Sequence, residues 1–154
     1  MHETEFYQKI LGLESPWVVA DVKLDTEAGQ VDIFVEHREG TKFCCPECGS
    51  ELACYDHVSA RRWRHLDTMQ YRTILRAAPP RVKCPEHGVK QVALPWAEKG
   101  SRFTLFLERF AIDVLLATQT VQGAGGILRT SWDETWHILK KAVARGKARK
   151  TDKA

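Results

Sequence analysis

The sequence has no apolar stretch that approaches the roughly 18–20 residues required of a membrane-spanning helix. Its amino terminus also lacks the basic segment before an apolar one that marks a secretory signal, and carries His2, Glu3 and Glu5 instead. The cysteine count of 5 is odd, and without export a disulfide framework is not expected. We therefore expect a cytoplasmic protein with no membrane partner, whose cysteines serve metal binding or packing.

The charge of the chain is unevenly distributed. Its 154 residues suit one domain or two small modules, and an apolar content of 44% is enough for a core. The net charge of +3 hides an asymmetry, because acids predominate in residues 1–40 whereas bases predominate in residues 60–83 and 140–153. Two separate basic blocks favour a polyanionic partner. Charge alone leaves open the alternative of a solvated strand face and tail.

Hydrophobic periodicity divides the chain into a β-rich part and a helical part. We expect a short helix over 4–12 and strands over 17–24, 31–36, 62–66, 70–77 and 89–94. After Pro95, apolar residues recur at helical spacing over 103–118, and a further helix is expected over 132–144. The expected fold class is α+β.

Two short motifs match each other: Cys45-Pro-Glu-Cys48 and Cys84-Pro-Glu-His87, each followed by glycine. Two residues between ligands let one tight turn direct both side chains at a single ion, and glycine accommodates the backbone dihedrals of that turn. Four nitrogen and sulfur ligands form the closed tetrahedron of a structural zinc site. We therefore expect one structural Zn²⁺ held by Cys45, Cys48, Cys84 and His87, with no coordination position open for a substrate. Metal binding would supply folding free energy to a β module with little core.

The other cysteines and histidines near these motifs leave alternatives. Cys44 could replace Cys45 as a ligand, but only Cys45 reproduces the spacing of the second motif. Cys54 has no partner at ligand spacing and is expected to be a small buried hydrophobe. His57 and His65 are expected to be surface or hairpin residues. A redox Cys-x-x-Cys pair would need a βαβ context, for which the sequence gives no pattern.

The helical part contains a capping box, Ser131-Trp-Asp-Glu134, which predicts that a helix begins at Trp132. Apolar residues of this helix share one face: Trp132, Trp136, Leu139 and Val143. A shorter helix over 120–127 would complete a helix-turn-helix, with its core contacts made by Val121, Ala124 and Leu128. Three glycines oppose that shorter helix by about 1 kcal/mol each relative to alanine, so close packing must offset part of the cost: Gly123, Gly125 and Gly126. A small helical bundle is the alternative.

Several segments then occur in a fixed order: Cys45-Pro-Glu-Cys-Gly49, Arg62-Trp-Arg-His-Leu-Asp67, Pro80-Arg-Val-Lys-Cys-Pro-Glu-His-Gly-Val89, Pro95-Trp-Ala97 and Gly100-Ser-Arg-Phe-Thr104. This order resembles the amino-terminal part of bacterial insertion-sequence transposases of the ISL-three family, over nearly the whole chain. The resemblance implies a zinc-finger domain followed by a helix-turn-helix, with Ser131-Trp-Asp133 at the start of its recognition helix. Family members continue into a catalytic domain with an Asp-Asp-Glu triad that binds divalent metal. Because this sequence stops before that domain, we expect no catalysis of transposition from these residues alone.

The sequence thus predicts a small β-rich zinc-binding module followed by a helical helix-turn-helix module. The expected divisions are an N-terminal helix and β-hairpin over 1–40, the zinc-binding β module over 41–94, a connector over 95–104, the helix-turn-helix over 105–146 and a basic tail over 147–154.

The expected function is zinc-dependent binding of double-stranded DNA in the nucleoid, at the terminal repeats of an insertion sequence or a related site, with no small-molecule substrate. Base-edge contacts are expected from Asp133 and His137. Phosphate contacts are expected from Lys140, Lys141, Arg145, Lys147, Arg149 and Lys150, with a second backbone contact from Arg61, Arg62 and Arg64. An alternative is a zinc-stabilised interaction module, in which the β domain binds another protein and the helices dimerise through Phe103, Phe106 and Phe110. A third class is an enzyme, either a nuclease or a redox protein using Cys45 and Cys48.

Overall fold

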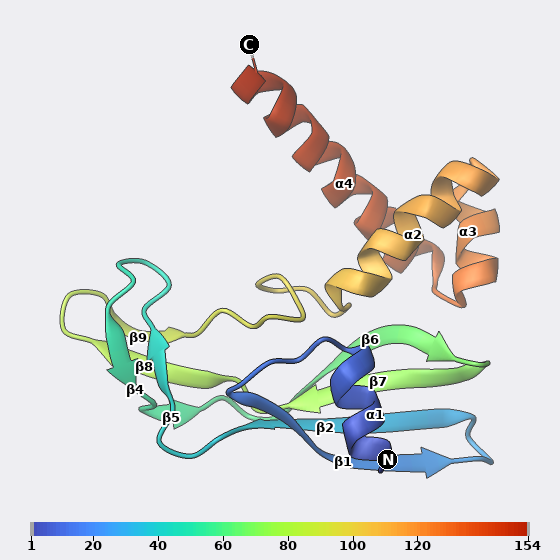
Figure 1. The fold of residues 1–154 in the computed structure, drawn as a ribbon. Helices are drawn as coiled ribbons and strands as arrows, with labels where there is room; N and C mark the ends of the chain where they lie inside the picture. Colours follow the sequence, from blue (N-terminus) through green and yellow to red (C-terminus); the bar gives the residue numbers. More distant parts are fainter. Residues whose placement is uncertain (1, 154) are drawn as a thin grey trace. The chain divides into compact units, whose positions relative to one another are not determined.

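The computed structural model describes the backbone of residues 2–153 and the side chains of residues 2–147. The chain divides into two compact units, with the division between Thr104 and Leu105. The first unit is β-rich and the second is helical (Figure 1), so the α+β fold class predicted from the sequence is confirmed. Among the described residues, no helix is both long and apolar enough to cross a membrane.

A four-stranded sheet forms the body of the first unit. Its strands are β1 (Trp17–Asp25), β2 (Gln30–His37), β6 (Arg61–Thr68) and β7 (Tyr71–Ala77), in the spatial order β1-β2-β7-β6. β2 runs parallel to β7, whereas the β1–β2 and β6–β7 pairs are antiparallel. The sheet therefore joins strands from both sides of residue 40, where the sequence suggested a division.

The core of this unit follows one row of residues across the sheet. Ile33 of β2 lies opposite Leu75 of β7, which lies opposite Trp63 of β6. Their exposed fractions are 0%, 0% and 3%, and burying each such side chain contributes about 1.5–3 kcal/mol. Trp96 packs edge-on against both Trp17 and Trp63, with ring centroids 5.0 and 5.5 Å away. The segment expected to be a connector therefore begins as part of the core.

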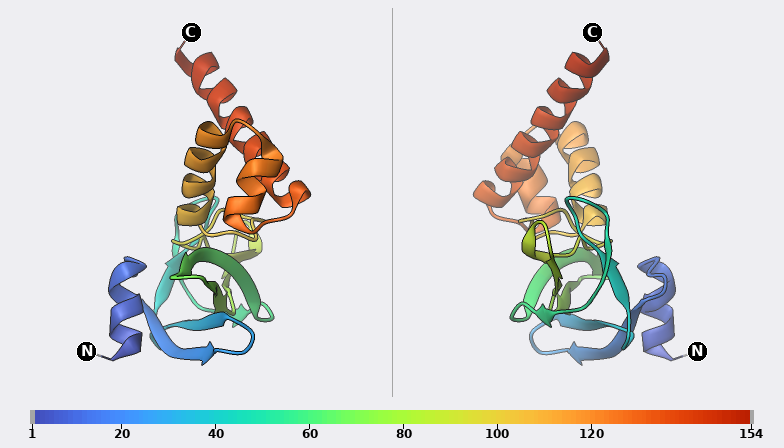
Figure 2. Two further views of the ribbon diagram at one scale, coloured as in Figure 1. Left: turned by 90° about the vertical axis from the view of Figure 1, so that its right-hand side faces the viewer. Right: turned by 90° about the vertical axis from the view of Figure 1, so that its left-hand side faces the viewer.

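Helix α1 (Glu3–Ile10) lies against β1 at one side of the sheet (Figure 2). Gln8 fixes it there, because its amide nitrogen donates to the carbonyl oxygens of Leu13 and Trp17 and its amide oxygen accepts from the Val19 backbone. Tyr7 is buried, and its hydroxyl donates to Thr68 at the end of β6. The expected amino-terminal helix is present and closes one end of the core.

The shorter strands of the first unit are β3 (Lys42–Cys44), β4 (Glu51–Ala53), β5 (Asp56–His57), β8 (Pro80–Cys84) and β9 (Gly88–Gln91). β3 and β4 form a hairpin, and β5, β8 and β9 form a three-stranded sheet. The sequence did not predict β8, because Pro79-Pro80 reads as an interruption. Proline is tolerated at the first position of a strand, which is where Pro80 stands.

The second unit has three helices: α2 (Leu105–Thr118), α3 (Val121–Leu128) and α4 (Trp132–Lys153). Thr120 caps α3 by accepting a hydrogen bond from the Gly123 backbone. Ser131 accepts from the Glu134 backbone, while Glu134 accepts from the Ser131 backbone, which confirms the predicted capping box. The backbone of α4 continues beyond the predicted 132–144 through most of the expected basic tail, whose Lys, Arg and Ala residues are good helix formers.

The buried face of α4 differs from the one suggested by its apolar pattern. Thr135 and Ile138 are buried at 0% and 1%, whereas Trp132 and Trp136 are 54% and 45% exposed. The Thr135 hydroxyl lies 2.7 Å from that of Thr130 and donates to the Ser131 carbonyl, so its polar atom is satisfied inside the unit. The two tryptophan rings stack on each other outside, with centroids 5.7 Å apart.

Close packing of α3 explains one of its glycines. A Cβ atom at Gly125 would lie 3.0 Å from the Thr130 carbonyl oxygen and 3.1 Å from the Thr135 hydroxyl. Gly126 next to it has open space where its Cβ would be. The predicted core contacts Ala124 and Leu128 are buried, and Val121 is partly buried. The close packing that the glycines require is thus present at Gly125.

Candidate metal centre and nucleic-acid interface

Two tight turns bring the four predicted zinc ligands together. The first turn follows β3, where the Gly49 backbone donates to the Cys45 carbonyl at 2.8 Å. The second joins β8 to β9, with Cys84 paired to Gly88. Gly49 and Gly88 both have φ of +76°, a left-handed conformation that a side chain would strain. The repeated glycine after each motif therefore has a backbone role.

The donor atoms of Cys45, Cys48, Cys84 and His87 all lie within 4.8 Å of one another. The two sulfurs of Cys48 and Cys84 are 3.7 Å apart, and His87 Nδ1 lies 3.5 Å from Cys84 Sγ and 3.9 Å from Cys45 Sγ. Zinc bond lengths require tetrahedron edges of about 3.8 Å between two sulfurs and about 3.6 Å between sulfur and nitrogen. The donor set and its spacing fit one zinc ion with four protein ligands.

Neighbouring groups orient these ligands. His87 offers Nδ1 to the cluster, while its Nε2 lies 3.6 Å from a carboxylate oxygen of Glu47, which also pairs with Lys90 at 3.1 Å. At this distance the carboxylate makes an electrostatic contact with the outer nitrogen, and Nδ1 is the ring nitrogen that faces the sulfurs. The Ser50 hydroxyl, 3.2 Å from Cys48 Sγ, is the main cause that lowers the pKa of this thiol to about 6. Cys48 is thus predisposed to the thiolate form that zinc binds.

Cys44 lies outside the cluster. It is exposed in β3, whereas Phe43 and Cys45 on either side of it are buried. Successive side chains of an extended segment point to opposite faces, so only one of two adjacent cysteines can face the ion. The structure therefore selects Cys45, as the spacing argument predicted.

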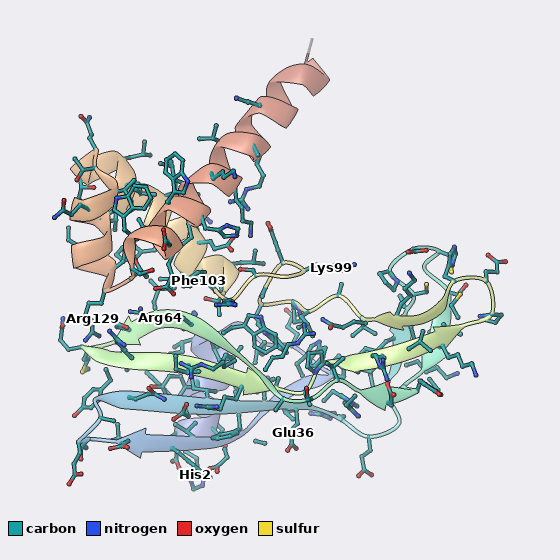
Figure 3. All side chains as sticks on the ribbon, turned by 180° about the vertical axis from the view of Figure 1, so that it is seen from behind. His2, Glu36, Arg64, Lys99, Phe103 and Arg129 are labelled. Carbon is teal, nitrogen blue, oxygen red and sulfur yellow. The ribbon has the colours of Figure 1, made fainter. Side chains whose placement is uncertain are left out.

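The helical unit places part of the predicted DNA-contacting set on one exposed surface. Asp133, His137 and Lys140 are exposed in the first turns of α4, and Lys147 is exposed further along it. Arg129 lies in the turn between α3 and α4 with φ of +57°, where Figure 3 labels it. The side chains of Arg149 and Lys150 are outside the described part of the chain.

Two of the predicted phosphate contacts have a partner inside the unit. Lys141 Nζ lies 2.9 Å from Glu108 Oε1, and Arg145 lies 3.9 Å from Glu108 Oε2. The Glu108 side chain is only 4% exposed. These pairs connect α4 to α2, and they turn both basic side chains towards the inside of the unit.

Comparison with protein families matches both parts of the chain. Residues 41–87 match the model described as the zinc-finger of transposase IS204/IS1001/IS1096/IS1165. Residues 92–143 match the helix-turn-helix domain of transposase family ISL3. These two segments thus match a zinc finger and a helix-turn-helix domain of ISL3-type transposases. Residues 41–87 are therefore an ISL3 zinc ribbon, and Cys45, Cys48, Cys84 and His87 form a cluster that can hold its zinc ion.

Two curated relatives share this region. Both are described as the transposase for insertion sequence element IS1557, one from Mycobacterium tuberculosis strain CDC 1551 / Oshkosh and one from strain ATCC 25618 / H37Rv. Each is 31% identical over 150 residues, covering 94% of this chain and 33% of the relative. The chain thus spans about a third of the length of these curated relatives. No solved structure matches it significantly.

The basic residues of strand β6 lie within the ISL3 ribbon, between the short strands β5 and β8. Arg61 and Arg62 are exposed, whereas the side chain of Arg64 is only 12% exposed and pairs with Asp67 at 3.4 Å. His65 beside it is mostly buried, with Nδ1 at 2.8 Å from the Thr104 hydroxyl, and burial lowers its pKa to about 4. His65 therefore has a structural role, in agreement with the hairpin position predicted for it.

Sequence reasoning missed a second group of metal-type side chains beside the ISL3 ribbon. The donor atoms of His37, Cys54 and His57 also lie within 4.8 Å of one another. Cys54 packs partly against the core, as expected of a small hydrophobe, but its sulfur also faces His57 at 3.8 Å. His37 ends β2 and lies 20 residues before His57 in the sequence. No local spacing could have indicated this group, because the three residues come together only in the folded structure.

Proposed function

We propose that the chain binds double-stranded DNA through the α3–turn–α4 unit and recognises the terminal inverted repeats of an insertion sequence or a related site. The observation that carries this proposal is the capped start of α4, whose first turns expose polar and basic side chains after a three-residue turn. A helix presented in this way is the element that enters the major groove in helix-turn-helix proteins. The two IS1557 relatives are transposases, which supports a role in DNA binding.

Asp133 and His137 are the proposed base-edge contacts, because they lie one turn apart on the exposed surface at the amino-terminal end of α4. Lys140 and Lys147 follow along the helix as proposed phosphate contacts, with Arg149 and Lys150 beyond them. Exposed Arg61 and Arg62 of the first unit add a second proposed backbone contact. Arg64, Lys141 and Arg145 are less suited to phosphate, because acidic partners within the protein already engage them.

The zinc ion has a structural role in this proposal. Four protein ligands fill its coordination sphere, so no position remains for a substrate. When bound, the ion contributes folding free energy to the short strands around it. In this proposal the chain binds DNA without cutting it. Strand cleavage by a transposase needs acidic residues gathered around divalent metal ions.

The test is fluorescence anisotropy with a terminal-repeat duplex and a shuffled duplex of equal length, over a range of salt concentrations. We expect tighter binding to the repeat and a steep loss of affinity with salt, because each neutralised phosphate releases counterions. Equal affinity for both duplexes would leave only non-specific binding. Affinity that does not change with salt would overturn phosphate contact altogether.

Homodimerisation is a second candidate, which one observation favours. Phe106 and Phe110 of α2 are 51% and 43% exposed, which is unusual for large apolar side chains so close in sequence. Phe103, the third residue of the predicted set, is buried at 5% and is not available to a partner. Sedimentation of the chain with and without repeat DNA distinguishes a stable dimer from a monomer that binds DNA alone.

A further inference from the structure

We propose that His37, Cys54 and His57 form a second metal site, which takes a borderline or soft transition-metal ion such as Zn²⁺ or Cu⁺. The three side chains come from separate parts of the first unit: His37 ends β2, Cys54 follows β4 and His57 ends β5. Imidazole and thiolate together are the ligand types preferred by these ions. None of these three side chains belongs to the zinc ribbon cluster.

The two histidine rings meet edge to edge. Their planes differ by 12° and their centroids are 5.0 Å apart. Their Nε2 atoms are 2.7 Å apart, closer than the atoms of two rings stacked face to face can come. The two Nε2 atoms therefore point at each other, and Cys54 Sγ lies 3.8 Å from His57 Nε2.

The backbone sets the tautomer of His37. Its Nδ1 lies 2.9 Å from the Arg38 carbonyl oxygen, which can only accept, so Nδ1 carries the proton. Nε2 of His37 then offers a lone pair to the cluster. A ring nitrogen held by a backbone carbonyl, with the other nitrogen free to coordinate, is the usual arrangement of a metal-binding histidine. In the metal-free state, His57 Nε2–H donates to this lone pair.

Metal binding requires a rearrangement of the two histidine rings. Tetrahedral zinc requires about 3.3 Å between two nitrogens and about 3.6 Å between sulfur and nitrogen. The separation of 3.8 Å between Cys54 Sγ and His57 Nε2 is close to this value. The two rings must separate by about 0.6 Å and tilt until both lone pairs meet at the ion. His57 is exposed and can supply this movement by rotating its side chain. On binding, the Cys54 thiol releases its proton and the proton of His57 moves to Nδ1.

The position of the cluster indicates what the ion would do. His37 ends β2 of the four-stranded sheet, whereas Cys54 follows β4 of the short hairpin and His57 ends β5 of the three-stranded sheet. An ion bound by all three would cross-link the four-stranded sheet to the short strands. Three protein ligands leave one position for water, so this ion should bind more weakly and exchange faster than the ribbon zinc.

The test titrates the full chain, carrying its ribbon zinc and freed of excess metal, with Co²⁺ or Zn²⁺ alone. We expect a second equivalent to bind, with Co²⁺ giving the absorption of a site that has one thiolate. Cys54→Ser and His57→Gln should each lower the affinity for the second metal equivalent at least tenfold and leave the ribbon zinc in place. His2→Gln, an exposed histidine outside the cluster, is the matched control and should change neither.

Binding of one equivalent only would overturn the proposal, as would a second equivalent that survives both substitutions. If Cys54→Ser loses the ribbon zinc because of its partly buried position, His57→Gln decides alone, since truncating an exposed ring leaves no cavity. Neither result bears on DNA binding by α4.

Discussion

Glu108 of α2 and Lys141 of α4 form an ion pair, with 2.9 Å between Oε1 and Nζ, in which the carboxylate is almost fully buried. Arg145 approaches the other carboxylate oxygen from the next turn of α4. A buried charge that loses its partner is costly, so this pair fixes how α4 lies on α2. The orientation of the proposed recognition helix therefore depends on residues that do not themselves face DNA.

We expect Glu108→Gln to destabilise the helical unit by about 2–3 kcal/mol, because it leaves two cationic side chains without their buried counter-charge. Chemical denaturation followed by circular dichroism measures the effect. Asp113→Asn, which changes an exposed acid on the same helix, is the control and should cost less than about 0.5 kcal/mol. Equal stability of the two variants would contradict the role of the pair.

The two adjacent glycines of α3 should respond oppositely to alanine. Gly125→Ala places a Cβ 3.0 Å from a backbone oxygen, so we expect it to destabilise the unit by about 1–3 kcal/mol. Gly126→Ala has open space and should stabilise it by up to about 1 kcal/mol through helix propensity. Thermal unfolding of both variants tests this, and the same sign of change in both would contradict the close packing of α3.

Zinc removal should unfold the ribbon. Cys84→Ser removes a buried ligand, and we expect it to lose the tightly held zinc and the cooperative unfolding of the first unit. Cys44→Ser is the matched control, because it changes the neighbouring exposed cysteine outside the cluster. Metal analysis after dialysis and circular dichroism measure both. Loss of the zinc from Cys44→Ser, with retention in Cys45→Ser, would show that the ligand is assigned to the wrong cysteine.

His65 should make the first unit sensitive to acid. Its folded-state pKa of about 4 lies below the ordinary 6.5, so the unfolded chain binds the proton more readily. The contribution of His65 to the free energy of unfolding is complete above pH 6.5. It is lost as the pH falls from 6.5 towards 4, and the total loss is about 3 kcal/mol. We expect His65→Gln to flatten the pH dependence of unfolding over this window. Parallel curves for the variant and the parent chain would show that His65 is not the cause.

The sequence was informative where structure depends on local spacing. The two zinc motifs and the capping box at Ser131 each lie within one turn, so their residues determine their geometry directly. The choice of Cys45 over Cys44 followed from the same spacing. These features could be predicted because no distant contact competes with them.

Features that depend on tertiary pairing could not be predicted. The prediction of which face of α4 is buried was wrong. Thr135 is a core residue, because its hydroxyl forms hydrogen bonds inside the unit, whereas Trp132 and Trp136 remain largely exposed. Phe103 was placed on a surface although it is buried. His37 joined Cys54 and His57 only because β2 and the ribbon strands come together in space. Periodicity carries no information on which of two comparable faces finds a partner.

The central claim, that the exposed surface of α4 reads DNA, is tested most directly by the affinities of His137→Ala and Lys140→Ala for the terminal-repeat and shuffled duplexes. His137→Ala should weaken binding to the repeat by about 5- to 100-fold, because a base contact is lost. Its affinity for the shuffled duplex should be almost unchanged. Lys140→Ala should weaken both duplexes and lower the salt slope by about one. Lys9→Ala, an exposed lysine of α1, should leave both affinities unchanged. Affinities of His137→Ala and Lys140→Ala equal to those of the parent chain for both duplexes would contradict DNA recognition by this helix.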